Sequence, residues 1–106
     1  MSVTFYDPSN LVKYNEDGDQ IGGGLDINVS NGNAFEILLA LGLCTLENPV
    51  LWGTLDGDTF RKCCIKALLI IHMKELHPND YRSFYLSQKI NRLLTVFADC
   101  ETVNWD

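Results

Sequence analysis

Long apolar segments and an excess of basic charge are both absent from this sequence of 106 residues. Apolar runs such as Ala67–Ile71 are far too short to cross a bilayer, and no basic segment followed by an apolar one forms a signal peptide. Fourteen acidic residues against eight basic ones give a net charge of −6, which opposes binding to nucleic-acid phosphates and anionic lipids. We therefore expect a cytoplasmic protein that binds neither membranes nor nucleic acid directly.

Catalytic and cofactor motifs are missing as well. The three glycines at 22–24 precede a predicted strand, whereas a phosphate loop precedes a helix. The oxygen-rich turn at 15–19 lacks the ligand spacing of a calcium loop, and the serines form no nucleophile elbow. These absences predict a protein with no cofactor, no metal and no enzymatic activity.

The four cysteines include no Cys-x-x-Cys pair. Cys63 and Cys64 are adjacent on a predicted helix, where side chains of neighbouring residues point roughly 100° apart. His72 follows Cys64 by eight residues, about 12 Å along such a helix, which is too far for both to bind one metal ion. We expect four free thiols, buried as small apolar groups in a reducing compartment.

The apolar pattern predicts one α+β domain that comprises residues 1–106. Strands are predicted at Val3–Tyr6, at Leu11–Tyr14, at Leu25–Val29 and, as an edge strand near the C-terminus, at Thr102–Trp105. Whether Leu11–Tyr14 pairs with the others is open. Between the strands the spacing of apolar residues predicts three helices, which cover one face of a small antiparallel or mixed sheet.

Cap residues define the limits of these helices. Ser30–Asn33 supplies N-caps for a helix over 34–41, and Gly42 suits a left-handed end in which Leu43 folds back on Leu38. After a loop around Asn48-Pro49 and Gly53, a second helix runs from an Asp56 or Asp58 cap to about Leu76, before Pro78. A third helix follows an Asn79 or Asp80 cap, and the short connection predicts an antiparallel hairpin of these two helices.

The buried faces of the two long helices follow from the same spacing. In the second helix the core face comprises Phe60, Cys64, Ala67, Leu68 and Ile71, with Leu69 and Ile70 widening it. In the third helix it comprises Leu86, Ile90, Leu93, Leu94 and Phe97. We expect the second helix to be the most buried of the three.

Three segments resemble a family of small uncharacterised bacterial and phage proteins: LDINVSNGNAFEILLALGL (Leu25–Leu43), LWGTLDGD (Leu51–Asp58) and FYLSQKINRLL (Phe84–Leu94). The resemblance covers about a third of the chain and consists of a strand, an Asn-rich cap and a short Leu-rich helix that ends in Gly-Leu. It implies a fold unit of bacterial or phage type and carries over no functional residue.

Charge is unevenly distributed along the chain. Residues 1–58 carry nine acids and one base, a net −8, whereas residues 59–106 carry five acids and seven bases, a net +2. The acids Glu16, Asp17 and Asp19 share one predicted turn that has no evident core role. We interpret this turn as a partner-binding site, with a solvated acidic surface as the alternative.

Two further features are candidates for partner binding. Trp52 lies in a loop flanked by Pro and Gly, which favours a place in the core, with an interaction anchor as the alternative. Arg82 and Lys89 are seven residues apart on the third helix and share a face, which serves either as a charged outer surface or as a docking site.

These features together predict non-enzymatic recognition of another protein. The concrete form is a small acidic inhibitor or immunity-type protein that binds a basic partner. One alternative is a phage or mobile-element accessory protein that acts as a DNA mimic, and another is a small hydrolase or nucleotide-binding enzyme. The identity of the partner and the oligomeric state are open.

Overall fold

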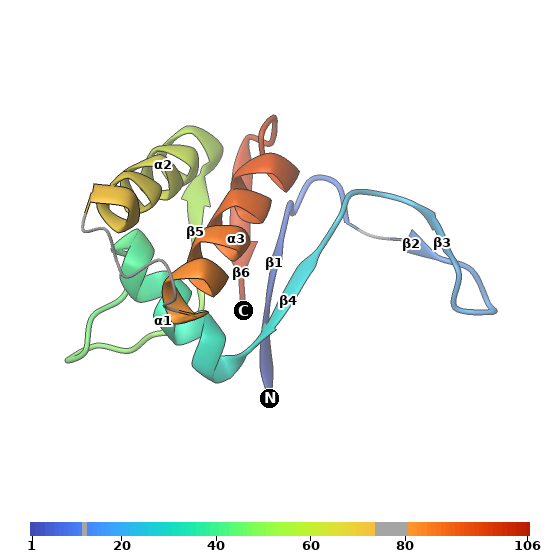
Figure 1. Cartoon of the computed structure of the whole chain (residues 1–106). Coiled ribbons are helices and arrows are strands. Elements are labelled where there is room, and N and C mark those ends of the chain that lie inside the picture. The colour runs from blue at the N-terminus through green and yellow to red at the C-terminus, as the bar shows by residue number, and fades with distance from the viewer. Residues whose placement is uncertain (12, 74–80) are drawn as a thin grey trace.

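The structure is a computed structural model that describes residues 1–11, 13–73 and 81–106 (Figure 1). The strands are Ser2–Tyr6 (β1), Lys13–Tyr14 (β2), Gln20–Gly22 (β3), Ile27–Ser30 (β4), Gly53–Asp56 (β5) and Thr102–Trp105 (β6). The helices are Asn31–Leu41 (α1), Gly57–Met73 (α2) and Tyr81–Val96 (α3). The predicted helix end at Leu76, the stop at Pro78 and the Asn79 or Asp80 cap lie outside the described residues.

Four strands form one antiparallel sheet in the order β4-β1-β6-β5, with three helices in the same chain, which confirms the predicted α+β class. Val3 lies opposite Val29 in the β1–β4 pair, and Leu55 lies opposite Val103 in the β5–β6 pair. The prediction of Thr102–Trp105 as an edge strand is wrong, because β5 pairs along its other side. Sequence reasoning placed β5 in a loop.

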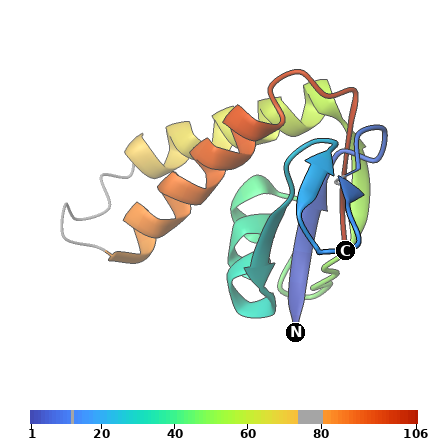
Figure 2. The same cartoon turned by 90° about the vertical axis from the view of Figure 1, so that its right-hand side faces the viewer.

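Alternation along the strands separates an apolar inner face from a polar outer face. The inner face supplies Val3, Phe5, Ile27, Val29, Val103 and Trp105 to the core. On the outer face Asn28 donates hydrogen bonds from Nδ2 to the hydroxyls of Ser2 and Thr4, at 3.0 and 2.8 Å. Figure 2 shows α1 and the α2–α3 pair on the same side of the sheet, where they cover the inner face.

Helix α1 begins at Asn31, three residues before the predicted start, and ends at Leu41 as predicted. The hydroxyl of Ser30 accepts a hydrogen bond from the amide of Asn33 at 3.3 Å. At the other end Gly42 has a φ of 76°, and the amide of Leu43 donates to the carbonyl of Leu38 at 2.8 Å. These bonds confirm the predicted N-cap and the predicted Schellman-type end, which satisfy backbone groups that a helix leaves unpaired.

Helices α2 and α3 pack side by side as an antiparallel pair (Figure 1), as predicted. Phe60, Cys64 and Ala67 of α2 are buried against Ile90, Leu93 and Phe97 from α3 and its C-terminal end. The expectation that Leu69 and Ile70 widen this face, and that α2 is the most buried helix, is wrong. Leu69 is 57% exposed, because the sheet and α3 pack on one side of α2 and no other described element covers the opposite side.

The connection between β1 and β4 forms a separate projection, which we call the arm and define as residues 7–26. Within it β2 pairs with β3 in a two-stranded sheet, so Leu11–Tyr14 does contain a strand, but one that does not join the main sheet. Figure 1 shows the arm extending sideways from the end of the four-stranded sheet at which β1 ends and β4 begins.

Candidate functional site

The base of the arm is closed by backbone hydrogen bonds. The amide of Asn10 donates to the carbonyl of Asp7 at 3.1 Å, and the amide of Gly24 donates to the carbonyl of Asn10 at 2.8 Å. A Cβ atom on Gly24 would lie only 2.9 Å from that carbonyl oxygen, so the close approach of the two chain segments requires glycine here. The arm therefore leaves the sheet at a defined place.

The tip of the arm is an ordered turn built around Asn15. The side-chain oxygen of Asn15 accepts hydrogen bonds from the backbone amides of Asp17 and Asp19, both at 2.9 Å. The backbone amide of Asn15 donates to the carbonyl of Asp19. Gly18 has a φ of 85°, a conformation that glycine adopts without strain. The turn is thus held by its own backbone and by Asn15, and the acidic side chains take no part in holding it.

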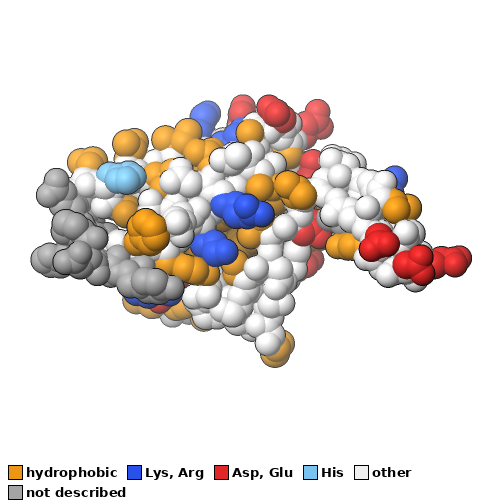
Figure 3. Space-filling model, turned by 45° about the vertical axis from the view of Figure 1, so that its right-hand side comes forward, with side chains coloured by type: hydrophobic (Ala, Val, Ile, Leu, Met, Phe, Trp, Pro, Cys, Tyr) orange, Lys and Arg blue, Asp and Glu red, His pale blue; other side chains and the backbone are white. Residues whose placement is uncertain are grey.

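Glu16, Asp17 and Asp19 are all exposed at this tip, as the sequence-based interpretation requires. Figure 3 shows acidic side chains gathered at the free end of the arm. Within the described part of the chain, none of the three carboxylates has a hydrogen bond or an ion pair. These charges are therefore free to interact with another molecule.

The arm also exposes large apolar side chains, which sequence reasoning missed. Leu11, Tyr14, Ile21 and Leu25 are between 52% and 66% exposed. Leu25 was expected on the inner face of the sheet but precedes β4 and stays outside the core. A two-stranded hairpin with its apolar side chains in water is only marginally stable alone. The combination of acidic and apolar groups is typical of a surface that another molecule covers.

A second acidic region lies beside the start of α2. It surrounds a depression of about 350 Å³ that is lined by Asp56, Asp58, Arg61, Asp99, Cys100 and Glu101. A neighbouring depression of about 260 Å³ separates the base of the arm from the loop after α3 and shares Asp99 and Cys100. The fold thus adds Asp99 and Glu101, from the net-positive half of the sequence, to acids of the net-negative half.

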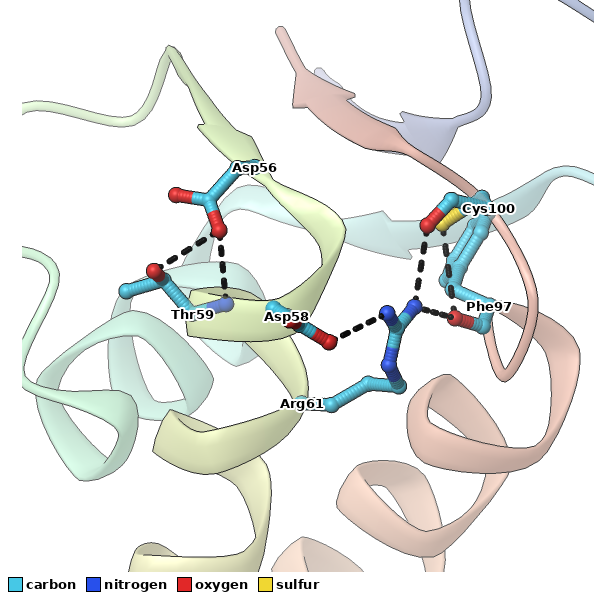
Figure 4. A network of polar contacts seen from close by, with 6 residues as sticks. All are labelled: Asp56, Asp58, Thr59, Arg61, Phe97 and Cys100. Carbon is cyan, nitrogen blue, oxygen red and sulfur yellow. Dashed lines mark hydrogen bonds and ion pairs between the residues drawn. The ribbon is translucent and has the colours of Figure 1, made fainter.

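Arg61 is the basic residue of this region, and its contacts are structural. Its Nη1 donates to the carbonyls of Phe97 and Cys100 at 2.9 and 3.0 Å, and its Nη2 pairs with Asp58 at 3.0 Å (Figure 4). The guanidinium therefore satisfies carbonyls at the C-terminal end of α3 and joins that end to α2. Its donors are turned toward backbone carbonyls, so it offers no ready anion site.

Asp56, in the same region, has a lowered pKa. Asp56 accepts hydrogen bonds from the amide and the hydroxyl of Thr59, at 2.9 and 2.8 Å, and these bonds lower the pKa of Asp56 (Figure 4). Asp56 is thus the N-cap of the second helix, one of the two candidates, Asp56 or Asp58, that the sequence predicts. Because these bonds favour the charged carboxylate, Asp56 is poorly suited to donate a proton near neutral pH.

Three of the four thiols, those of Cys44, Cys64 and Cys100, are poorly suited to nucleophilic chemistry. Burial, and secondarily the neighbouring Cys63, raises the pKa of Cys64 to about 12. Burial also raises the pKa of Cys44 and, together with the charge of Asp7, that of Cys100. His72 is exposed near the end of α2, and His77 lies outside the described residues. Among residues 1–11, 13–73 and 81–106, no group of three His, Cys, Asp or Glu side chains could hold a metal ion.

Trp52 is 69% exposed, so the favoured placement in the core is wrong, and the alternative, an interaction anchor, stays a prediction. The buried indole is that of Trp105, which packs on the inner face of the sheet and lies opposite Gly53. Its ring centroid lies within 6.2 Å of those of Phe5 and Phe60. Trp52 immediately precedes β5, the edge strand farthest from β4, and so lies away from the arm.

Arg82 and Lys89 share a face of α3, as predicted, and both lie over the ring of Tyr85, at 5.0 and 5.7 Å from its centroid. Arg82 also forms an ion pair with Glu36 of α1 and contacts Asn33. These contacts fasten α3 to α1. The fold therefore does not bring Arg82, Lys89, Trp52 and the acidic turn together into one site.

Comparisons with protein-family models, with curated proteins and with solved structures find no match to this chain. The resemblance of residues 25–43 to small bacterial and phage proteins accordingly stays an expectation. No helix in the described segments is both long and apolar enough to span a membrane.

Proposed function

We propose that the protein recognises another protein, without catalysis, and that it binds a basic partner through the arm. The observation that carries this proposal is the arm itself: a projection with a defined base and an ordered tip that exposes both carboxylates and apolar side chains. A small acidic inhibitor or immunity-type protein is the form of recognition that this supports.

The two kinds of side chain on the arm have different physical roles. Glu16, Asp17 and Asp19 attract a basic surface over a Debye length of about 10 Å at 0.1 M salt, and so accelerate encounter. Tyr14 and Ile21, beside them, supply apolar area that is removed from water when a partner covers the arm. Recognition elements are commonly loops or turns presented by a rigid scaffold, which the sheet and helices supply here.

The acidic depression supports a second candidate, the imitation of DNA. Asp56, Asp58, Asp99 and Glu101 form a second group of carboxylates, and a DNA mimic uses acids spread widely over its surface. If the protein worked in this way, acids at both places would contribute to binding. If the arm is the binding element, only its acids would contribute.

A pull-down from native lysate, followed by mass spectrometry, tests the proposal. The arm variant combines Glu16→Gln, Asp17→Asn and Asp19→Asn. The matched control combines Glu47→Gln, Asp99→Asn and Glu101→Gln, three exposed acids outside the arm. We expect the arm variant to lose the partner and the control to retain it. Because both variants change the net charge by the same amount, a loss in the arm variant alone would depend on where the charges lie.

Kinetics with the captured partner complete the test. The arm variant should associate more slowly, and its on-rate should depend less on salt. Equal losses in the two variants would favour DNA imitation, and competition by duplex DNA for the same partner would then be expected. An arm variant with unchanged on-rate and salt dependence would refute the arm as the binding site.

A further inference from the structure

The outer side of α2 carries a stripe of exposed apolar side chains, which no other described element covers. Ile65, Leu69 and Met73 are spaced by four residues, so they lie along one side of the helix, with Ile70 beside them. These four side chains are between 41% and 79% exposed. We call them the outer stripe. Figure 3 shows hydrophobic side chains gathered over α2, at the end of the molecule opposite the arm.

This arrangement is unusual for a helix on the surface of a lone molecule. The opposite side of α2 is already buried through Phe60, Cys64 and Ala67. A surface helix normally has one apolar side and one polar side, and a helix that is apolar on both sides is usually covered on both. Single exposed apolar residues are ordinary, but a row of them marks an interaction surface.

The charges that accompany the outer stripe are basic. Lys62 and Lys66 are exposed among its members. The acid of α2 is Asp58, and it is paired with Arg61 at the start of the helix. The outer stripe is therefore an apolar surface flanked by positive charge, and it fits an occupant that is apolar and acidic.

The arm has this complementary chemistry. It carries five acids and one base, and its exposed apolar side chains include Tyr14 and Ile21 near the acidic tip. Within one molecule the tip of the arm and the outer stripe lie at opposite ends of a body whose longest extent is 46 Å (Figure 1), so they do not meet. The contact can form only between two molecules.

We propose that two copies of the chain associate, with the arm of each lying on the outer stripe of α2 in the other. The two contacts are then identical and close the pair as a two-fold dimer. This inference rests on the arm being a recognition element, as in the proposed function: the second copy covers the arm, and a basic partner competes with it.

Sedimentation velocity measures the association, with Leu69→Asp as the first variant. The unchanged protein should form dimers that dissociate as protein concentration falls or salt rises. Leu69→Asp should be monomeric, whereas the matched control Leu46→Asp, at an exposed leucine outside both surfaces, should still dimerise. Circular dichroism checks that both variants remain folded, which is expected because Leu69 and Leu46 are exposed.

Charge reversal tests which surfaces meet. One variant combines Glu16→Lys, Asp17→Lys and Asp19→Lys, which changes the net charge of the arm from −4 to +2. The other combines Lys62→Glu with Lys66→Glu. Each alone should be monomeric, because its arm and its α2 have charges of the same sign. Mixed in equal amounts they should form a one-to-one dimer, because each arm then meets an α2 of opposite charge.

Three outcomes would overturn the dimer. The first is a wild-type protein that is monomeric at every concentration. The second is an arm variant that still dimerises, which would mean that α2 packs against α2. The third is a mixture of the two charge-reversal variants that remains monomeric. Partner capture separates this result from the proposed function. If the protein is monomeric and the arm variant still loses the partner, only the dimer is refuted. If the protein dimerises and no partner depends on the arm, only the proposed function is refuted.

Discussion

The indole of Trp105 lies directly over Gly53 across the β5–β6 pair, so that a Cβ atom on Gly53 would be 2.7 Å from Cζ2 of the indole. Trp105 is only 5% exposed and stacks with Phe60, so its ring has little freedom to move away. The relationship explains why glycine occupies an inner position of an edge strand, where it contributes no side chain to the core.

Substituting Gly53 with alanine should therefore destabilise the protein. We expect Gly53→Ala to lower the free energy of unfolding by about 1–3 kcal/mol, the usual cost of an overpacked core. The control is Gly32→Ala in α1, where a Cβ meets nothing within 4 Å. That change should stabilise by about 0.5–1 kcal/mol, because alanine favours a helix. Urea unfolding followed by circular dichroism measures both, and equal effects would contradict the close packing of Gly53 and Trp105.

Arg61 should stabilise the junction between α2 and the end of α3. Replacing it with methionine keeps the apolar stem but leaves the carbonyls of Phe97 and Cys100 without their donor. We expect Arg61→Met to lower the free energy of unfolding by about 1–3 kcal/mol. Arg92→Met, at an exposed position of α3, should change it by less than about 0.5 kcal/mol. A similar small effect for Arg61 would show that water replaces the guanidinium at these carbonyls.

Asp56 should make the stability of the protein depend on pH. Hydrogen bonds from Thr59 lower the pKa of Asp56 below its ordinary 3.8. The charged carboxylate therefore stabilises the fold at higher pH, and this stabilisation is lost as the pH falls through the lowered pKa. Asp56→Asn should therefore lower the melting temperature at pH 7, and the difference should narrow well below pH 3.8. Asp17→Asn, which changes an exposed carboxylate without such bonds, should have little effect at either pH. A difference for Asp56→Asn that does not change with pH would show that charge has no part in the cap.

The four cysteines should react with a thiol reagent at different rates. Cys63 is partly exposed, whereas burial raises the pKa of Cys64 to about 12 and also raises that of Cys44 and of Cys100. Because the thiolate is the reactive form, we expect iodoacetamide to modify Cys63 first in the folded protein, and all four cysteines after denaturation without reductant. Peptide mass spectrometry identifies the modified sites. Fast modification of Cys64 in the folded state, or fewer than four thiols after denaturation, would contradict this packing.

The parts of the fold that follow from neighbouring residues were predictable from the sequence. Ser30 and Gly42 determine where α1 begins and ends, because an N-cap hydroxyl and a left-handed glycine act on backbone groups within a few residues. The strand-forming residues at Val3–Tyr6 and the alternation at Leu25–Val29 likewise predicted β1 and β4. The acidic turn at Glu16 was identified because turn residues and charges are both local features.

The parts that depend on distant partners were decided only by the tertiary structure. Strand β5 is short, and it forms because β6, some fifty residues later, pairs with it. Trp52 directly precedes β5 and Trp105 is the last residue of β6, and only Trp105, which lies opposite Gly53, is buried on the inner face of the sheet. Leu69 was predicted to widen the core face of the second helix. It is exposed because burial requires a second surface, and among residues 1–11, 13–73 and 81–106 of a single copy no element lies against that side of α2.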